Sequence, residues 1–410
     1  MALHTYHETK SPEAAKIYEL VKWYQKQVEP YGIKDIPIYI SEYGVTTPDE
    51  YTGIENKTNW IVRDTILFKA HGVGDYMFLY NMEQKSIIDT AREDNFGIVT
   101  HPEPAYQVDG KTCLATQPYV AYTAMNYVLG GHVIPDGTWE PGNEIYLNRF
   151  KSEKWNSNVL TMWSADGSKS LTLDLGVDKV DYYDRYGNKT VIYGKDGIFT
   201  FLIDERPAYI VGNFERNLVK NHEPIIEYDQ YRAVSAKDEG KAAFTVSVKE
   251  GSGYTVAAKA LYGDDHETVT EVKDGKARVL CDVAGGLGTG TYVDVYLRKN
   301  DKNISYAQIP VDFVDNVSSE LSFDIKDKSN YDDWNVTARV ENNMNDTPIS
   351  GYIEFSEPPE LAKAGKTDIE TIGANESKDI TINVPDLKEK GLRNFAYSVV
   401  TNEVTPVAFS

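Results

Sequence analysis

The pattern of apolar residues changes class at about residue 130, and this change limits the possible folds more than any other feature. Before it, short apolar runs alternate with segments whose apolar residues recur at helical spacing. After it, nearly the whole chain has the pattern of strands divided by turn sequences such as ADGSK and DRYGN. The chain is therefore predicted to join an α/β part to an all-β part.

The first part contains three strand–helix units. The apolar runs ALHTY, IPIYIS and DYMFLYN are predicted strands. The predicted helices are one that begins with Ser11 as its cap and Pro12 in its first turn, and the segments NKTNWIVRDTILFKAHG and QPYVAYTAMNYVLGG. Short apolar strands that alternate with helices are typical of a parallel sheet buried on both faces.

The chain has 410 residues, enough for several domains. Strand-rich blocks separated by polar stretches predict four of them. They are the α/β part at 1–132, a β-sandwich at 133–214, and two immunoglobulin-like β-sandwiches at 223–315 and 316–410.

Charge and composition exclude several classes of partner. The formal net charge of −21 repels nucleic acid and anionic membranes, and it makes neutral ligands easier to accommodate. Two distant cysteines and the absence of paired histidine spacing predict no metal and no cofactor. No apolar run approaches the ~20 residues that cross a bilayer. The opening residues MALHTYHETK lack the apolar core of a signal peptide.

Polar and aromatic residues follow each of the three predicted parallel strands. His4 and Tyr6 end the first strand, Glu42 ends the second within IPIYISEYG, and Tyr80 and Asn81 end the third. Parallel strands end at one edge of their sheet, so these side chains are expected at that edge. Two interpretations of Glu42 stay open. It is either a catalytic carboxylate on a rigid element, or a carboxylate that caps the next helix or pairs with a basic residue.

The phrases LHTYHETKSPE, IPIYISEYG, GDYMFLYN, FGIV and QPYVAYTAMNYVLGG, in this order, resemble the last third of a clan A retaining glycoside hydrolase of the xylosidase or cellulase kind. The resemblance implies that Glu42 is the catalytic nucleophile and that Tyr6 donates a hydrogen bond to it. It also implies that His4, Tyr80 and Asn81 line the sugar subsite. The segment 133–214 is similar to the accessory β-domain that packs beside such barrels.

The chain departs from this family in one respect. A (β/α)8 barrel needs eight strands and about 250 residues, but only one predicted strand precedes Glu42. The expected fold is therefore a partial barrel with the last strands only, followed by the β-sandwich and the two immunoglobulin-like domains. No acid/base residue is assigned, since Glu8 and Glu13 qualify by proximity alone and Glu13 suits a helix first turn. A preceding segment or a second chain is expected to complete the barrel.

Two functions follow from these observations. The first is hydrolysis of O-glycosyl bonds in a polysaccharide or oligosaccharide, by a retaining enzyme of which this is the C-terminal part. The alternative is a non-catalytic carbohydrate-binding or cell-surface module. Three tryptophans are open either to sugar stacking or to packing in the core or at the interface of the barrel part with the sandwich: Trp139, Trp155 and Trp163. By resemblance the protein is expected outside the cell or at its surface, with carbohydrate as its partner.

Overall fold

The computed structural model describes the chain except for residues 1, 8–9, 34–37, 47–52, 74–75, 84–94, 101–113, 143, 215, 217, 220–225, 229–231, 236–239, 250–252, 262–265, 288–289, 328–331, 364, 385–394, 403–406 and 410. The chain divides into two compact units. One comprises Met1–Pro224 with Asp301–Tyr306, and the other comprises Ile225–Asn300 with Ala307–Ser410.

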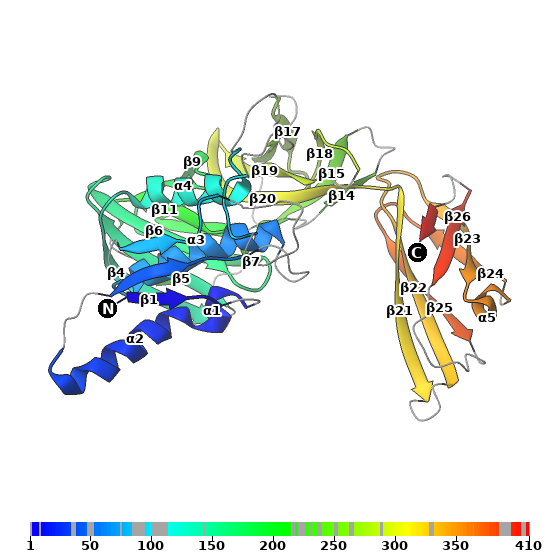
Figure 1. The fold of residues 1–410 in the computed structure, drawn as a ribbon. Helices are drawn as coiled ribbons and strands as arrows, with labels where there is room; N and C mark the ends of the chain where they lie inside the picture. The colour runs from blue at the N-terminus through cyan, green and yellow to red at the C-terminus, as the bar shows by residue number, and fades with distance from the viewer. Residues whose placement is uncertain are drawn as a thin grey trace. The chain divides into compact units, whose positions relative to one another are not determined.

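The first unit begins with a three-stranded parallel sheet and its helices, drawn in blue to cyan in Figure 1. The strands follow the order β1 (Ala2–Thr5), β2 (Tyr39–Tyr43), β3 (Met77–Leu79). The helices are α1 (Pro12–Ala15), α2 (Ile17–Val28), the 3-10 helix η1 (Glu29–Tyr31), α3 (Ile54–Ala70) and α4 (Gln117–Leu129). The order of strands and helices agrees with the sequence-based prediction. None of the described helices is long and apolar enough to cross a membrane.

The first predicted helix is interrupted at Lys16. The Ser11 hydroxyl accepts a hydrogen bond from the Ala14 amide at 3.3 Å, as expected of a helix cap. Lys16 then adopts φ of 52°, in the left-handed region, and so ends α1 and precedes α2. The apolar periodicity of 17–28 predicted α2 but gave no sign of this break, because lysine is an ordinary helix former.

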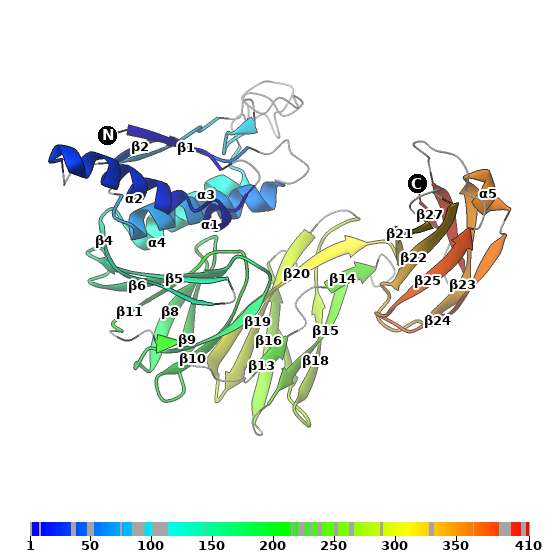
Figure 2. The ribbon, with the colours of Figure 1, turned by 90° about the horizontal axis from the view of Figure 1, so that it is seen from below.

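Helix α3 lies between two sheets, as Figure 2 shows. Phe68 packs against Ile40 and Tyr43 of the parallel sheet. On its other side, Val62 and Ile66 join a cluster with the sandwich strands. With neighbours on both sides, α3 is buried along most of its length and even its polar side chains are enclosed.

The rest of the first unit is a β-sandwich of two sheets. The larger sheet has the order β4-β5-β6-β11-β8-β9, and the smaller has the order β10-β7-β12. Buried aromatics such as Phe199 and Phe201 stack in its core. The strands are β4 (Val133–Gly142), β5 (Ile145–Ser152), β6 (Ser157–Ser164), β7 (Lys169–Asp174), β8 (Lys179–Tyr183), β9 (Lys189–Tyr193), β10 (Ile198–Ile203), β11 (Ala208–Gly212) and β12 (Leu218–Val219).

The second unit consists almost entirely of strands, in sheets ordered β13-β15-β18, β14-β20-β19-β16-β17, β21-β22-β25 and β24-β23-β26-β27. The strands are β13 (Ile226–Tyr228), β14 (Arg232–Ser235), β15 (Lys241–Val248), β16 (Tyr254–Ala260), β17 (Thr268–Glu271), β18 (Lys276–Asp282), β19 (Gly290–Lys299), β20 (Lys302–Val314), β21 (Val317–Asp327), β22 (Asp332–Asn342), β23 (Ile349–Glu357), β24 (Lys366–Ile372), β25 (Ser377–Val384), β26 (Ala396–Thr401) and β27 (Val407–Phe409). A short helix, α5 (Pro359–Ala362), follows β23.

The predicted combination of a small α/β part with a larger all-β part agrees with this architecture. The finer statements, namely the four domain boundaries, the immunoglobulin-like type of the last two blocks and the origin of the parallel sheet in a barrel, stay predictions.

Candidate functional site

The carboxyl-terminal edge of the parallel sheet brings His4 beside Glu42. The register of β1 against β2 shifts after Leu3, so that His4 is the partner of Glu42. This irregularity sets the two side chains side by side although they come from strands 38 residues apart.

Glu42 is held by two neighbours. The Tyr6 hydroxyl donates a hydrogen bond to Glu42 Oε2 at 2.9 Å. His4 Nδ1 lies 3.2 Å from the same oxygen. The Glu42 side chain keeps 37% of its surface exposed, so the carboxylate is oriented by the protein and still open to a ligand. The structure thus brings together three of the residues that the sequence had singled out.

Tyr80 reaches the same site through Phe96. The rings of Tyr6 and Tyr80 both meet the Phe96 ring edge to face, with centroids 5.6 and 5.4 Å away. Phe96 itself is buried. Sequence reasoning gave Phe96 no role, and its position in the FGIV phrase was the only available signal.

The close approach of Tyr80 and Phe96 to residue 44 explains why SEYG ends in a glycine. The Tyr80 amide donates to the Tyr43 carbonyl at 2.8 Å, which draws the two strand ends together. A Cβ atom on Gly44 would lie 2.1 Å from the Tyr80 carbonyl oxygen and 3.2 Å from the Phe96 ring. Any larger residue would therefore push Tyr80 and Phe96 away from Glu42.

Asn81 contributes a buried acceptor. Within the described part of the chain, its side-chain oxygen Oδ1 has no hydrogen-bond partner. A buried polar atom without a partner is costly in a folded protein, and a bound ligand is one way to satisfy it. Asn81 therefore offers an acceptor for a hydroxyl group next to Tyr80.

Lys57 fixes the segment that carries Phe96. Its ammonium group donates hydrogen bonds of 2.7 Å to the carbonyls of Asn95 and of Gly97, on either side of Phe96. The side chain comes from α3 and is almost completely enclosed. Because burial disfavours the charged form, the pKa of Lys57 falls to about 7. No pattern in the sequence indicated this contact.

Two further pairs are buried near the start of the chain, around His7 and Glu13. His7 Nε2 lies 2.9 Å from Asp64 Oδ2. Burial lowers the pKa of His7, but the Asp64 carboxylate, the Lys10 carbonyl and Glu13 together outweigh this effect and raise the pKa overall. In the other pair, Glu13 accepts a hydrogen bond from Arg63 Nε at 2.8 Å and another from Trp163 Nε1 at 2.8 Å.

The environment of Glu13 removes it as a candidate acid/base. Its carboxylate is enclosed between α3 and the sandwich, where Arg63 and Trp163 bind it. Glu8 lies outside the described residues. Over the described part of the chain, no second carboxylate contacts Glu42 and no group of His, Cys, Asp and Glu side chains has the arrangement of a metal site.

The three tryptophans have structural contacts. Trp163 is fully buried, and Trp155 donates from its indole nitrogen to the Val128 carbonyl at 2.6 Å. The Arg149 guanidinium lies over the Trp139 ring, 5.3 Å from the centroid of that ring. For Trp163 and Trp155, packing between the helices and the sandwich is the interpretation that these contacts favour.

Comparisons with known proteins are weak throughout. No family model and no curated protein sequence matches this chain. A family 39 glycoside hydrolase from the gut symbiont Bacteroides cellulosilyticus WH2 is 16% identical over 48% of this chain and 37% of its own, with a TM-score of 0.39. The arabinose-bound MgGH51 α-L-arabinofuranosidase is 10% identical over 51% of this chain and 36% of its own, with a TM-score of 0.33. The chain thus spans little more than a third of either structure, and similarity at this level supports no argument about its function.

Proposed function

We propose that this chain is the carbohydrate-cleaving, C-terminal part of a retaining glycoside hydrolase, with Glu42 as its nucleophile. The observation that carries the proposal is the pair of contacts on one oxygen of Glu42, from the Tyr6 hydroxyl at 2.9 Å and from His4 Nδ1 at 3.2 Å. A carboxylate at a strand end that is oriented by hydrogen bonds and partly open to solvent suits nucleophilic attack on a sugar.

Each residue then has a chemical role. Glu42 attacks the anomeric carbon, the bond to the leaving oxygen breaks, and a glycosyl ester forms on the carboxylate. Tyr6 holds the attacking oxygen in place through its hydroxyl donor. His4 and Tyr80 border the sugar, and Asn81 Oδ1 accepts a hydrogen bond from a sugar hydroxyl. Water later cleaves the ester.

The acid/base carboxylate comes from outside this sheet under the proposal. The outer strands β1 and β3 each have a free side among the described strands of the sheet. The face away from the helices also carries exposed aromatic rings: Tyr39, Tyr76 and Phe78 are 36%, 55% and 59% exposed. Free edges and exposed rings favour further strands, supplied by a preceding segment or a second chain, which would bring the missing carboxylate.

A mechanism-based label tests the role of Glu42 without the acid/base carboxylate. A 2-fluoro glycoside with a good leaving group forms the glycosyl ester unaided by a general acid, and the fluorine slows its hydrolysis. Intact-mass measurement is expected to show one added sugar on the wild type and none on Glu42→Gln. Equal labelling of the two proteins would contradict the proposal.

The alternative function is a non-catalytic carbohydrate-binding or cell-surface module. It becomes the better explanation if no reagent in a broad panel labels the folded chain. Placement outside the cell or at its surface belongs to the same proposal in either case.

A further inference from the structure

The larger sheet of the sandwich has six strands, whereas the sheet that faces it has three. Phe150 on β5 and Val159 on β6 point to the helices, where they join the cluster with Val62 of α3. Side chains alternate along a strand, so the neighbouring Lys151 and Asn158 project from the opposite face. That face therefore carries polar residues at the end of β5 and the start of β6, where a sandwich interior would carry apolar ones.

Strand register gathers these polar residues into one place. Lys151 is the partner of Asn158 across β5 and β6, and Ile134 on β4 is the other partner of Lys151. Asn158 in turn faces Gly212 at the end of β11, directly before Asn213. The row crosses four adjacent strands.

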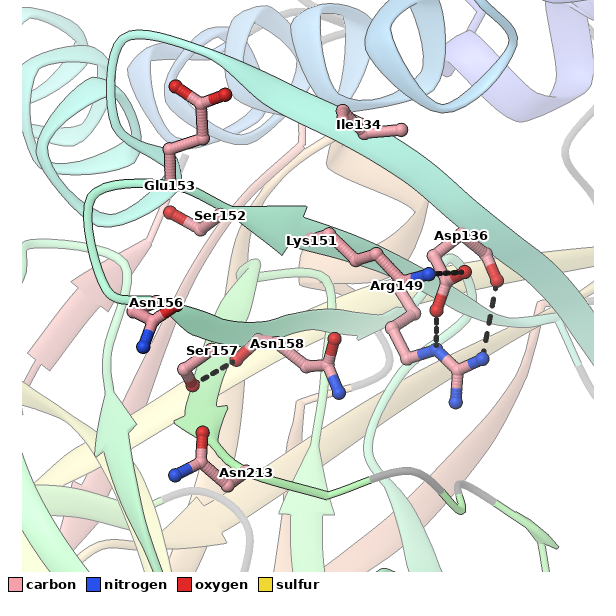
Figure 3. A pocket seen from close by; sticks show the side chains of 10 residues that line it. All are labelled: Ile134, Asp136, Arg149, Lys151, Ser152, Glu153, Asn156, Ser157, Asn158 and Asn213. Carbon is pink, nitrogen blue, oxygen red and sulfur yellow. Dashed lines mark hydrogen bonds and ion pairs between the residues drawn. The ribbon is translucent and has the colours of Figure 1, made fainter.

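A pocket of about 710 Å³ lies over this row. Figure 3 shows Arg149 and Lys151 gathered around Asp136 at one end and the amides of Asn158 and Asn213 at the other. A volume of this size is within the range of small-molecule sites.

The charges that line the pocket balance. Arg149 Nε lies 2.7 Å and Lys151 Nζ 3.3 Å from the carboxylate of Asp136, and Glu153 supplies a second acid. Two basic and two acidic side chains leave no net charge to attract an anion or a cation. The pocket therefore fits a neutral ligand.

The remaining lining offers hydrogen bonds of both kinds. Among the described residues, the side-chain amides of Asn156 and Asn213 make no hydrogen bond, so each presents a donor and an acceptor to the pocket. The turn after β5 holds the backbone of Asn156 at φ of 46°. In this turn the backbone N–H of Asn156 donates a hydrogen bond to the Glu153 carbonyl at 3.2 Å. Ile134, which is 49% exposed, adds an apolar surface at the rim.

We infer that this pocket is a second carbohydrate site, which binds a neutral oligosaccharide through the amides and Lys151 while Ile134 contacts the C–H face of a ring. Vicinal hydroxyls both donate and accept, as asparagine amides do, and this pairing favours a sugar over an ion. The inference goes beyond the proposed function, because the pocket lies on the sandwich and needs nothing from Glu42. It would hold the chain on a glycan whether or not the chain cleaves one.

Isothermal titration of the full chain with cellohexaose, xylohexaose and the anionic hexagalacturonate tests this inference. At least one neutral hexasaccharide is expected to bind. The double variant Lys151→Ala/Asn213→Ala is expected to weaken that binding about tenfold or more, since it removes two groups that would bond the sugar. Lys179→Ala, an exposed lysine of the same sheet, is the matched control and is expected to bind as the wild type does.

Glu42→Gln separates this inference from the proposed catalytic role. It is expected to lose labelling by the 2-fluoro glycoside and to keep oligosaccharide binding. Hydrogen exchange on the wild type is a second measurement that needs no variant, and added sugar is expected to protect backbone amides within 149–158. The inference is overturned by an absence of neutral-sugar binding, by binding of hexagalacturonate alone, or by equal affinity of the double variant when thermal unfolding shows it folded.

Discussion

Glu42 relies on Tyr6 for its orientation, and the variant Tyr6→Phe isolates that contact. The substitution removes one hydroxyl, and the Tyr6 ring can keep its edge-to-face contact with Phe96. A hydrogen bond to a charged group contributes about 1.5–3 kcal/mol. The rate of labelling by a 2-fluoro glycoside is therefore expected to fall by about tenfold or more.

Labelling kinetics by mass spectrometry measure this change. Tyr31→Phe, at an exposed tyrosine on η1, is the matched control and is expected to label at the wild-type rate. An unchanged rate in Tyr6→Phe would show that the observed hydrogen bond has no part in the chemistry.

Lys57 gives the first unit a pH dependence whose sign follows from its lowered pKa. The folded chain loses this proton near pH 7, whereas the unfolded chain keeps it to a pKa of about 10.4. Between these values the unfolded chain binds one proton more, so the free energy of unfolding rises with pH by about 1.4 kcal/mol per unit from this group. Below about pH 7 the contribution of Lys57 is constant.

Denaturant unfolding of the wild type and of Lys57→Met, followed by tryptophan fluorescence, tests this dependence. The variant has no amine to titrate, so the advantage of the wild type is expected to grow as the pH is raised from about 8 to about 10. A difference that stays flat over this interval would mean that the amine stays charged in the folded chain.

At the level of residues, the sequence identified those that end strands and missed those that support them. Glu42, His4 and Tyr6 were expected together because parallel strands end at one edge, and the structure brings them together, while their roles stay predictions. Phe96 and Lys57 were not found, because the contact joins α3 to a segment 38 to 40 positions away and leaves no local pattern. Glu13 was interpreted as a helix first-turn acid. Its contact with Arg63 depends on a helix 50 residues later, and its contact with Trp163 depends on a strand 150 residues later.

Helix α3 and the sandwich are joined by the Glu13–Arg63–Trp163 cluster, and Arg63→Met tests what this cluster contributes. The substitution leaves the Glu13 carboxylate buried without its cation, which costs about 3–5 kcal/mol. Chemical unfolding of the full chain is expected to show a loss of this size.

Lys189→Met is the control for Arg63→Met. The pair of Lys189 with Asp181 joins two strands at the surface, with side chains 48% and 36% exposed. Removing such a pair is expected to change the free energy of unfolding by less than about 1 kcal/mol. Equal effects of the two variants would show that the buried cluster does not join the helices to the sandwich.

Among the elements, the pattern of apolar residues located α2, α3 and α4 and indicated a strand-rich sandwich, but it did not predict the short helices η1 and α5. It missed the interruption at Lys16, since a residue in the left-handed region leaves no trace in a pattern of apolar residues. It also missed the shift in register between Leu3 and His4, which brings His4 opposite Glu42. Both irregularities lie in the segments that lead into the candidate site.

At the scale of the whole molecule, the change of pattern near residue 130 falls between α4 and β4, where the small α/β part gives way to the larger all-β part. The resemblance implied that the sandwich packs beside the α/β part, but the pattern of apolar residues did not show which side chains join the two into one compact unit. Side chains such as Phe150 and Val159 make that packing, and in the sequence they resemble any inward-facing strand residue. The pocket on the opposite face of these strands was not predicted either, because strand register decides which polar residues meet.

Peptide mapping of the chain after reaction with a 2-fluoro glycoside finds the residue that carries the sugar, and so tests whether Glu42 is the nucleophile. We expect one added sugar on the peptide that contains Glu42, with fragmentation placing it on that carboxylate. A label on any other residue of the folded chain, or no label across a panel of sugars, would contradict the claim that Glu42 is a glycosidase nucleophile.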